Sequence, residues 1–403
     1  MNISFEDTKT AFAYKSTIEL KRAKFLFESM GKKWLVRLGL WATPLALKLG
    51  LPVKGLIRKT IFSQFVGGET LEETSAVAEK LSRFNVQVIL DYGVEGKAGE
   101  ENFEHATDEF IKVIRYASTQ KNIPFMSVKL TGFSRFELLE KIDSLSVHND
   151  IIRGIIPLGK LSIDEKKEWE RVVARLNKIC EIAVQSNVSV LIDAEESWIQ
   201  DSVDAVTLQM MQKFNLSKAI VYNTAQLYRH DRLQFIKDSC VFAKQNKFIL
   251  AMKLVRGAYM EKERNRAEEL NYRSPINMNK QATDDEYNAA IEFCINPDNK
   301  IHAVIGSHNE YSNLLATQLM EKYLLHADEE RIHFSQLYGM SDNITFNLAK
   351  AGCKVSKYLP FGPIQDVIPY LMRRAQENSS VSGQTGRELL LVKQELKRRL
   401  EMS

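Results

Sequence analysis

Eight short apolar runs, each followed by a helical pattern, constrain the fold of this chain more than any other feature of its sequence. Most of these runs are continuous rather than alternating, which is typical of parallel strands buried on both faces. Eight successive β and α units predict a (β/α)8 barrel, an α/β fold. The predicted strands are Val86–Asp91, Phe125–Lys129, Val188–Asp193, Ala219–Asn223, Phe248–Val255, His302–Ser307, Arg331–Gln336 and Lys354–Tyr358.

The competing architecture is a doubly wound open sheet. Such a sheet usually carries a Gly-x-Gly-x-x-Gly turn after its first strand, and this sequence has none. We therefore predict an N-terminal helical region over residues 1–82, a barrel over 83–380 and a C-terminal helical tail over 381–403. The long connection Ile142–Leu161 predicts one or two additional helices, and the pattern of Glu388–Leu400 predicts an amphipathic helix. The last helix of the barrel is expected to lie over the active site.

Composition excludes several classes of function. A formal net charge of +4 over 403 residues, with scattered basic side chains, argues against a nucleic-acid partner. The histidines form no His-x-x-x-His or His-Glu-x-x-His motif, so no catalytic metal is expected. Widely spaced cysteines indicate neither disulfides nor a zinc site and fit a reducing cytosol; they are Cys180, Cys240, Cys294 and Cys353.

The segment Trp34–Ile57 is the part of the chain that most resembles a membrane segment. Charged residues and prolines interrupt it before about 18 apolar residues accumulate, so it is not expected to span a bilayer. Two interpretations remain open: its helices pack onto the main domain, or they lie on a membrane surface. The polar first residues contain no apolar signal core. We expect a cytoplasmic protein, either free or peripheral on the inner face of the membrane.

Polar side chains recur where the predicted strands end. In barrels of this kind the chemistry takes place at the carboxyl ends of the strands, and a purely structural barrel has no need of so many polar groups there. One shared site is therefore predicted from Asp91, Lys129, Asp193, Gln226, Arg256, His308, Gln336 and Tyr358.

A helix after the last strand carries two adjacent arginines. Gly362 and Pro363 suit its start, and Glu377 follows Arg373 by four residues and Arg374 by three. One glutamate can therefore brace both guanidinium groups. On spacing alone, a solvated surface helix explains these charges as well as a binding site does.

Several segments in one order resemble the proline dehydrogenase family. They are Phe65-Val-Gly-Gly-Glu69, Met126-Ser-Val-Lys-Leu130, Asp193-Ala-Glu-Glu196, Lys253-Leu-Val-Arg-Gly-Ala-Tyr259, Ser307-His-Asn309, Gln336-Leu-Tyr-Gly-Met340 and Tyr358 with Arg373-Arg374 and Glu377. The resemblance covers roughly residues 60–380. It implies a stand-alone, FAD-dependent barrel that oxidises L-proline to Δ1-pyrroline-5-carboxylate and passes electrons to a quinone.

The resemblance also implies roles for individual residues. Arg373, Arg374 and Lys129 hold the proline carboxylate, and Glu377 braces the arginines. Asp193 belongs to the polar wall near Lys129; its alternatives are a proton acceptor for the amine or a structural ion pair. The ring packs against aromatic and aliphatic side chains, namely Tyr259, Tyr358, Leu254 and Leu337. Tyr358 matches the position whose bulk disfavours hydroxyproline.

For the flavin, the resemblance implies two groups of residues. One faces the ring and pyrophosphate: Gln226, Lys253, Val255, Arg256, Gly257 and Ala258; the other faces the ribityl-adenine side: Ser307, His308 and Asn309. Many bacterial members carry arginine and lysine where this chain carries Lys253 and Arg256. Pro369 lies inside the arginine helix and removes one of its hydrogen bonds. The remaining alternatives are an enzyme for hydroxyproline or another cyclic imino acid, and a flavin-free barrel that binds a carboxylate.

Overall fold

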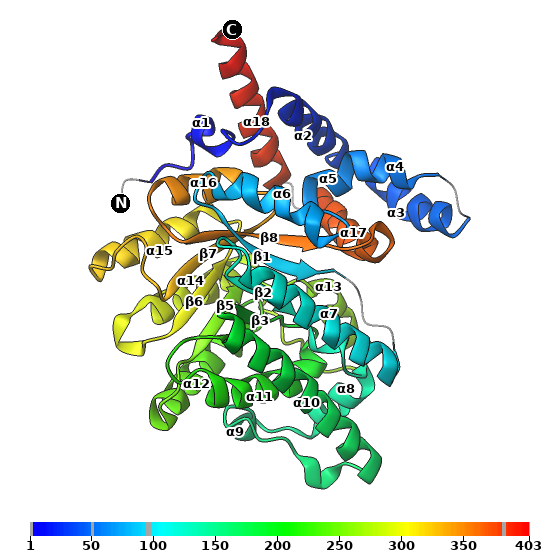
Figure 1. The fold of residues 1–403 in the computed structure, drawn as a ribbon, viewed down its shortest axis with the longest axis vertical. Coiled ribbons are helices and arrows are strands. Elements are labelled where there is room, and N and C mark those ends of the chain that lie inside the picture. Colours follow the sequence, from blue (N-terminus) through cyan, green and yellow to red (C-terminus); the bar gives the residue numbers. More distant parts are fainter. Residues whose placement is uncertain (1–2, 50–51, 94–97, 381–383, 403) are drawn as a thin grey trace. The chain divides into compact units, whose positions relative to one another are not determined.

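Eight parallel strands form a closed barrel in sequential order, which confirms the predicted fold (Figure 1). The computed structural model describes residues 3–49, 52–93, 98–380 and 384–402, and within these ranges it leaves out the side chains of 33, 44–48, 377–380, 384 and 385. Each predicted strand overlaps an observed one. The strands are β1 (Gln87–Tyr92), β2 (Phe125–Val128), β3 (Ser189–Ile192), β4 (Val221–Gln226), β5 (Ala251–Val255), β6 (His302–Gly306), β7 (Ile332–Leu337) and β8 (Val355–Phe361).

The strands are buried on both faces, as their continuous apolar sequences require. Every residue of β2, β3 and β4 is buried. The parallel register places Gln226 beside Val255 and Lys253 beside Val304. These pairings align the carboxyl ends of β4, β5 and β6, where the predicted polar residues lie.

The chain divides into two compact units, one of residues 95–334 and one that combines 2–94 with 335–403. The helices of the first unit are α7 (Glu100–Ser118), α8 (Phe136–Leu145), α9 (His148–Ile151), α10 (Ile163–Ser186), α11 (Ser197–Phe214), α12 (Arg232–Asn246), α13 (Met260–Glu269), α14 (Lys280–Ile295) and α15 (Glu310–Lys322). Those of the second are α1 (Thr8–Ala11), α2 (Thr17–Met30), α3 (Lys33–Lys48), α4 (Lys54–Ile57), α5 (Ser63–Phe65), α6 (Leu71–Ser82), α16 (Asp342–Lys350), α17 (Ile364–Ser380) and α18 (Gln384–Glu401).

In the first unit, helices pack in pairs outside the strands. Helix α7 lies along α10, and α8 lies along α11. Helix α10 starts with a capping box: the Glu165 carboxylate accepts from the Ser162 N–H, and the Ser162 hydroxyl accepts from the Glu165 N–H. The start of the helix is therefore marked by two residues within one turn of each other. The short helix α9 lies in the connection where an additional helix was predicted.

In the second unit, β1 pairs with β8, and a buried ionic cluster ties β8 to the connection between α1 and α2. Asp342 accepts a hydrogen bond from the Tyr14 hydroxyl at 2.8 Å and pairs with the Lys15 and Lys357 ammonium groups at 2.9 Å each. Lys357 is fully buried, so removing its partner would strand a charge. Helix α18 lies along α2 and contains the predicted helix of residues 388–400 (Figure 1).

The segment of uncertain role around Trp34 forms α3 and α4. Within the described ranges, every helix is too short or too polar to reach across a lipid bilayer. Trp34, Trp41 and Leu56 remain 66%, 68% and 67% exposed. Large apolar side chains with this exposure mark a surface that suits contact with another apolar body.

Candidate active site

Asp193 and Lys253 form a buried ion pair at the carboxyl end of the strands in the first unit. Asp193 directly follows β3, and Lys253 lies on β5. Their side chains are only 11% and 7% exposed, respectively. Alternate strands of a barrel contribute side chains to one layer of its interior, which explains how residues of β3 and β5 meet.

The charge environment of Asp193 favours its ionised form. Burial opposes ionisation, but the charges of Lys253 and Lys129, with hydrogen bonds from Lys253 and Ser127, together hold the pKa of Asp193 below its usual value. A carboxylate with a lowered pKa is a weak proton acceptor near neutral pH. Of the alternatives for Asp193, this environment favours the ion pair.

Glu195 is a buried carboxyl group of this region to which the sequence assigned no role. It accepts hydrogen bonds from the Thr131 backbone N–H at 3.2 Å and the Thr131 hydroxyl at 2.6 Å. Burial, only partly offset by Thr131 and the charge of Lys129, raises the pKa of Glu195 to about 7. Its place inside the Asp193-Ala-Glu-Glu196 motif was the available signal, but burial cannot be read from that motif.

Gln226 bridges two loops at the strand ends. Its side-chain amide donates to the Glu195 carbonyl at 2.7 Å, and its side-chain oxygen accepts from the Ala258 N–H at 3.3 Å. Gln226 is 3% exposed, whereas Ala258 is exposed. The loop after β5 is therefore anchored at one buried side chain, while its backbone remains accessible.

Gly257 needs to be glycine for two reasons. Its φ of +134° is rarely adopted by other residues, and a Cβ there would lie 2.6 Å from the ring of Tyr228. The ring thus packs directly on the backbone of the loop. Gly257 is exposed, Tyr259 is partly exposed, and Leu254 of β5 is fully buried, whereas Val255 is partly exposed.

Arg256 is bound by the protein on several sides. Its guanidinium pairs with Asp284 at 2.7 Å, donates to the Ser307 and Ser312 hydroxyls at 2.9 Å each, and lies 4.3 Å from the ring centroid of Tyr287. These contacts join the ends of β5 and β6 to α14 and α15. The side chain is nevertheless 25% exposed.

The Ser307, His308 and Asn309 segment connects β6 to α15. The Asn309 side chain caps α15 by accepting from the Ser312 N–H at 3.0 Å, and the Asn309 N–H donates to the Ser307 hydroxyl at 3.1 Å. Ser307 is buried, and His308 is partly exposed. Two of the three predicted cofactor residues therefore also shape the start of this helix.

The second unit contains the other predicted site residues. Tyr358 lies on β8 and is partly exposed, and its carbonyl accepts from the Tyr338 N–H at 2.9 Å. Leu337 ends β7 and packs against an apolar cluster that includes residues of α17. Helix α17 carries Arg373, which is partly exposed, and Arg374, which is 9% exposed. The helix continues through Glu377, whose side chain lies outside the described residues.

The start of α17 is fixed by neighbours in its own unit. The Ile364 N–H donates to the Glu69 carboxylate at 3.2 Å, and Gly362 adopts a φ of +142°. Pro363 was expected at the first helical position, but it lies one residue before α17, which begins at Ile364. The Pro363 carbonyl accepts the first backbone hydrogen bonds of the helix. Pro369 lies inside α17, as predicted.

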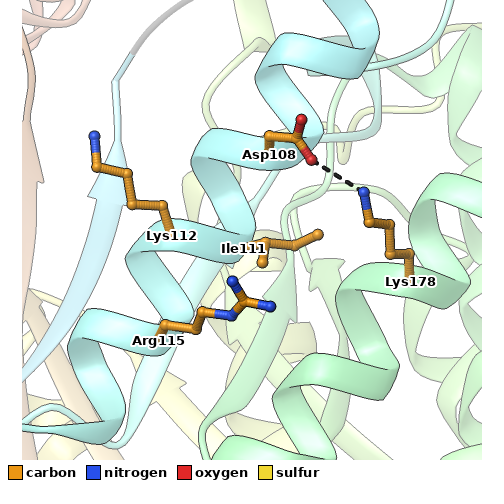
Figure 2. A pocket seen from close by; sticks show the side chains of 5 residues that line it. All are labelled: Asp108, Ile111, Lys112, Arg115 and Lys178. Atoms are coloured by element: carbon orange, nitrogen blue, oxygen red, sulfur yellow. Dashed lines mark hydrogen bonds and ion pairs between the residues drawn. The ribbon is translucent and has the colours of Figure 1, made fainter.

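Two other polar features lie outside the predicted site. A cleft of about 340 Å³ between α7 and α10 is lined by Asp108, Ile111, Lys112, Arg115 and Lys178 (Figure 2). Asp108 and Lys178 pair there at 3.0 Å. The cleft contains none of the residues that the sequence singled out, and its cations are solvated side chains on a helix surface.

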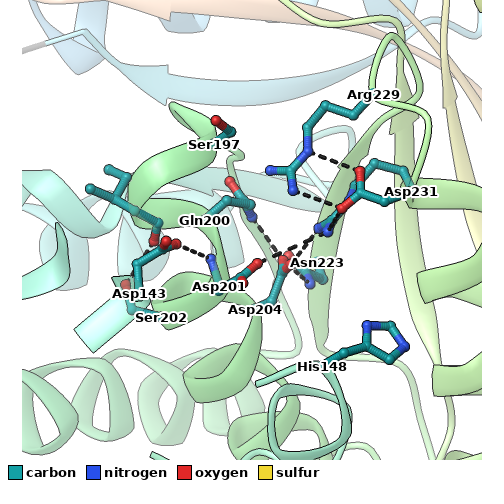
Figure 3. A network of polar contacts seen from close by, with 12 residues as sticks. Asp143, His148, Ser197, Gln200, Asp201, Ser202, Asp204, Asn223, Arg229 and Asp231 are labelled. Atoms are coloured by element: carbon teal, nitrogen blue, oxygen red, sulfur yellow. Dashed lines mark hydrogen bonds and ion pairs between the residues drawn. The ribbon is translucent and has the colours of Figure 1, made fainter. Parts of the chain in front are cut away.

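The second feature is a buried network behind β4 (Figure 3). Asp204 of α11 accepts hydrogen bonds from Gln200 and Asn223 at 2.8 Å each and pairs with Arg232 at 2.6 Å. Gln200 also accepts from the Glu195 N–H at 2.9 Å. Through Gln200, the network therefore binds the backbone of the loop that follows β3.

Among the residues that the structure describes, no three His, Cys, Asp or Glu side chains converge as ligands for a metal ion. The charged groups at the strand ends are instead paired lysines, arginines and carboxylates. Such a set is suited to binding an anionic or carboxylate ligand.

Comparison with known proteins decides the family. A sequence profile described as proline dehydrogenase matches residues 74–387. This chain belongs to the proline dehydrogenase family. It is 34% identical over 386 residues to the mitochondrial proline dehydrogenase 1 of Dictyostelium discoideum, covering 88% of this chain and 68% of that protein. It is 33% identical to the carbapenem antibiotics biosynthesis protein CarD of Pectobacterium carotovorum, covering 86% of each.

Solved structures agree with the fold of this proline dehydrogenase family member. Proline utilization A from Bdellovibrio bacteriovorus matches with a TM-score of 0.67 at 21% identity. The match covers 81% of this chain, which spans 34% of the length of that protein. At this identity, the likeness supports the barrel fold alone.

Proposed function

We propose that this chain oxidises L-proline to Δ1-pyrroline-5-carboxylate with FAD as its cofactor. The observation that carries the proposal is the buried Asp193–Lys253 pair beside Lys129, in a chain whose residues 74–387 match the proline dehydrogenase family. Proline carries a carboxylate, and a cationic wall at the strand ends suits that group.

In this proposal, Lys129, Arg373 and Arg374 bind the substrate carboxylate. Each charge-assisted hydrogen bond is worth about 1.5 to 3 kcal/mol, and arginine is able to bind a carboxylate with two of them. Fixing the carboxylate orients the ring, and orientation is the main contribution of the protein when a cofactor accepts the electrons. Tyr259, Tyr358, Leu254 and Leu337 then line the ring, and Glu377 braces the two arginines.

The residues at the strand ends fit a flavin. The loop backbone at Gly257 and Ala258 is exposed, and the loop conformation depends on glycine at position 257, where the Tyr228 ring occupies the place of a Cβ. Arg256 and Lys253 supply positive charge for phosphates and for a reduced ring. We assign these residues to the cofactor, together with Gln226, Val255, Ser307, His308 and Asn309. A flavin bound there would supply the two-electron acceptor for the hydride that leaves the proline ring carbon C5.

Asp193 keeps its ion-pair role in this scheme. The proline nitrogen must lose a proton before or during the loss of hydride from C5, because its lone pair forms the new C=N bond. The lowered pKa of Asp193 makes it a poor acceptor of that proton. In this proposal its negative charge binds Lys253 directly and offsets the repulsion between Lys253 and Lys129.

We propose a quinone as the electron acceptor and α3 with α4 as the surface that contacts the membrane. Between Glu28 and Glu69 the sequence has seven basic residues and no acidic one. Exposed tryptophans beside basic residues suit the interface of a bilayer with anionic lipids. The protein with Trp34→Ala and Trp41→Ala should float less with phosphatidylglycerol vesicles, whereas Met278→Ala with Leu324→Ala, two sites that are each 91% exposed, should float as the parent does.

The test of the proposed activity is the visible spectrum of the purified protein without oxygen. Flavin absorption bands that bleach on addition of L-proline, and not of trans-4-hydroxyproline, would support both the reaction and the role of Tyr358. If hydroxyproline bleached the flavin bands as efficiently as L-proline, the result would favour the alternative, an enzyme that oxidises hydroxyproline or another cyclic imino acid. A protein that remains colourless after incubation with FAD would contradict the proposal and support the alternative, a flavin-free barrel that binds a carboxylate.

A further inference from the structure

Glu263 is a fully buried carboxylate on one of the most polar helices of the protein. Helix α13 directly follows Tyr259, and only Glu263 and Ala267 are buried along its length. Glu263 itself has 0% exposure. A buried carboxylate is costly unless it is paired or hydrogen-bonded, so its partners define its function.

Both oxygens of Glu263 bind the start of α11. One accepts from the Ser197 backbone N–H at 2.7 Å, and the other accepts from the Ser197 hydroxyl at 2.6 Å. The residue before the helix, Glu196, makes no side-chain cap of its own. A carboxylate from α13 therefore caps α11, where the positive end of the helix dipole favours negative charge.

Further contacts between the same segments flank this cap. Lys262 pairs with Glu196, and the Arg266 guanidinium lies 4.4 Å from the ring centroid of Trp198. Three consecutive residues at the start of α11 are thus bound by α13. The segment between β3 and α11 also contains Asp193 and Glu195, four and two residues before Ser197.

The connection to the candidate site is short on both sides. The Glu263 N–H donates to the Tyr259 carbonyl at 2.9 Å, so Glu263 lies one helical turn from the ring predicted to contact the substrate. On the other side, the capped residue Ser197 follows the motif that contains Asp193. The carboxylate of Glu263 therefore holds the loop after β5 against the loop after β3.

We infer that Glu263 is a positioning residue, which fixes Tyr259 relative to Asp193 by capping α11 from α13. The effect of Glu263 on catalysis rests on the proposed function, whereas the cap of α11 is independent of that function. Glu263 makes no contact with the reacting atoms in this scheme. Its loss should loosen substrate binding more than it slows the chemical step.

The test compares Glu263→Gln with Glu261→Gln, the same chemical change at an exposed position of the same helix. Glutamine keeps the shape but removes the charge. Its amide oxygen can still accept from the Ser197 N–H, and its NH2 group can only donate to the Ser197 hydroxyl, so two charge-assisted hydrogen bonds become neutral ones. Hydrogen exchange of the backbone should rise about tenfold in residues 197–203 and 257–266 for Glu263→Gln, as expected when the charge-assisted hydrogen bonds of the cap become neutral ones. Glu261→Gln should match the parent in both segments.

Steady-state kinetics and ligand binding supply the second readout. For Glu263→Gln, the KM for L-proline should rise about tenfold with kcat changed less than about threefold. The dissociation constant of tetrahydrofuran-2-carboxylate, in which oxygen replaces the oxidisable amine, should rise in parallel. Ser197→Ala removes one of the two hydrogen bonds and should give a smaller change of the same kind. The double variant should be no worse than Glu263→Gln alone.

The outcomes separate the inference from the proposed function. Unchanged exchange in both segments would overturn the cap, and faster exchange limited to α11 with unchanged KM would overturn the positioning role. If the parent protein does not oxidise proline, the proposed function fails, while the exchange data still decide whether α13 and α11 are coupled. If Glu263→Gln does not fold, Ser197→Ala supplies both readouts by itself.

Discussion

Replacing Asp193 with asparagine should destabilise the protein by removing the counter-ion of a buried lysine. Both side chains of the Asp193–Lys253 pair are nearly inaccessible, at 11% and 7% exposure. Breaking a buried ion pair from one side typically costs about 3 to 5 kcal/mol, because the remaining charge is left in a poorly solvated position. The proximity of Lys129 adds repulsion between two cations, so we expect a loss near the upper part of this range.

Urea unfolding of the parent, Asp193→Asn, Lys253→Met and the double variant, at equal flavin occupancy, measures this effect. The double variant should lose less than the sum of the single variants, with a coupling free energy of about 2 to 3 kcal/mol. Asp108→Asn is a matched control, because Asp108 pairs with Lys178 where both side chains are more than half exposed. It should cost less than about 1 kcal/mol.

The pH dependence gives an independent check on Asp193. Its pKa is lowered in the folded protein, so its contribution is fully present above the usual value of 3.8 and is lost as the pH falls below it. The difference in unfolding free energy between the parent and Asp193→Asn should stay constant from about pH 6 to 8 and narrow below about pH 4. A loss for Asp193→Asn no larger than that for Asp108→Asn would refute the reasoning.

Three further predictions concern other parts of the protein. Gly257→Ala should lower flavin content or proline affinity at least about tenfold, since its Cβ would meet the Tyr228 ring at 2.6 Å; normal absorption and KM would contradict this. Asp143→Asn should stabilise the protein by a few kcal/mol at pH 8 and little near pH 4. Burial together with the charge of Asp201 raises the pKa of Asp143 to about 8, so between about pH 4 and pH 8 the folded protein holds a proton that the unfolded chain has lost. Asparagine removes this cost of proton uptake on folding. Thermal melting as a function of pH checks it, and an equal effect at both pH values would count against it. Lys357→Met should cost about 3 kcal/mol in urea unfolding; a neutral result would mean that its buried ionic cluster adds no stability.

The barrel was predictable because its signal is local. A parallel strand covered on both faces needs a continuous apolar run, and the helix that follows needs apolar residues repeating about every 3.6 residues. Each unit of strand and helix can therefore be recognised from about thirty consecutive residues. The α9 helix and the C-terminal helix were likewise readable from connection length and periodicity. The order of the family motifs then placed polar residues at the strand ends without any structural information.

The role of each polar residue was less accessible to sequence. Arg256 reads as a cofactor ligand by resemblance, yet its guanidinium also binds Asp284 and two serines, and Asn309 caps a helix. Nothing in the spacing of Glu195 and Glu263 distinguishes them from the many exposed glutamates of this chain. Burial and partners come from segments far apart in the sequence.

The sequence by itself determined the eight strands, the helices between them and the family, because hydrophobic periodicity and ordered motifs are properties of neighbouring residues. Only the tertiary structure decided that Asp193 is held by a lysine on β5, that Glu195 is buried and that Glu263 caps α11. The physical reason is that closing a barrel brings side chains of alternate strands into one layer. The charge and dielectric environment of each carboxylate follows from that packing, which no local pattern encodes.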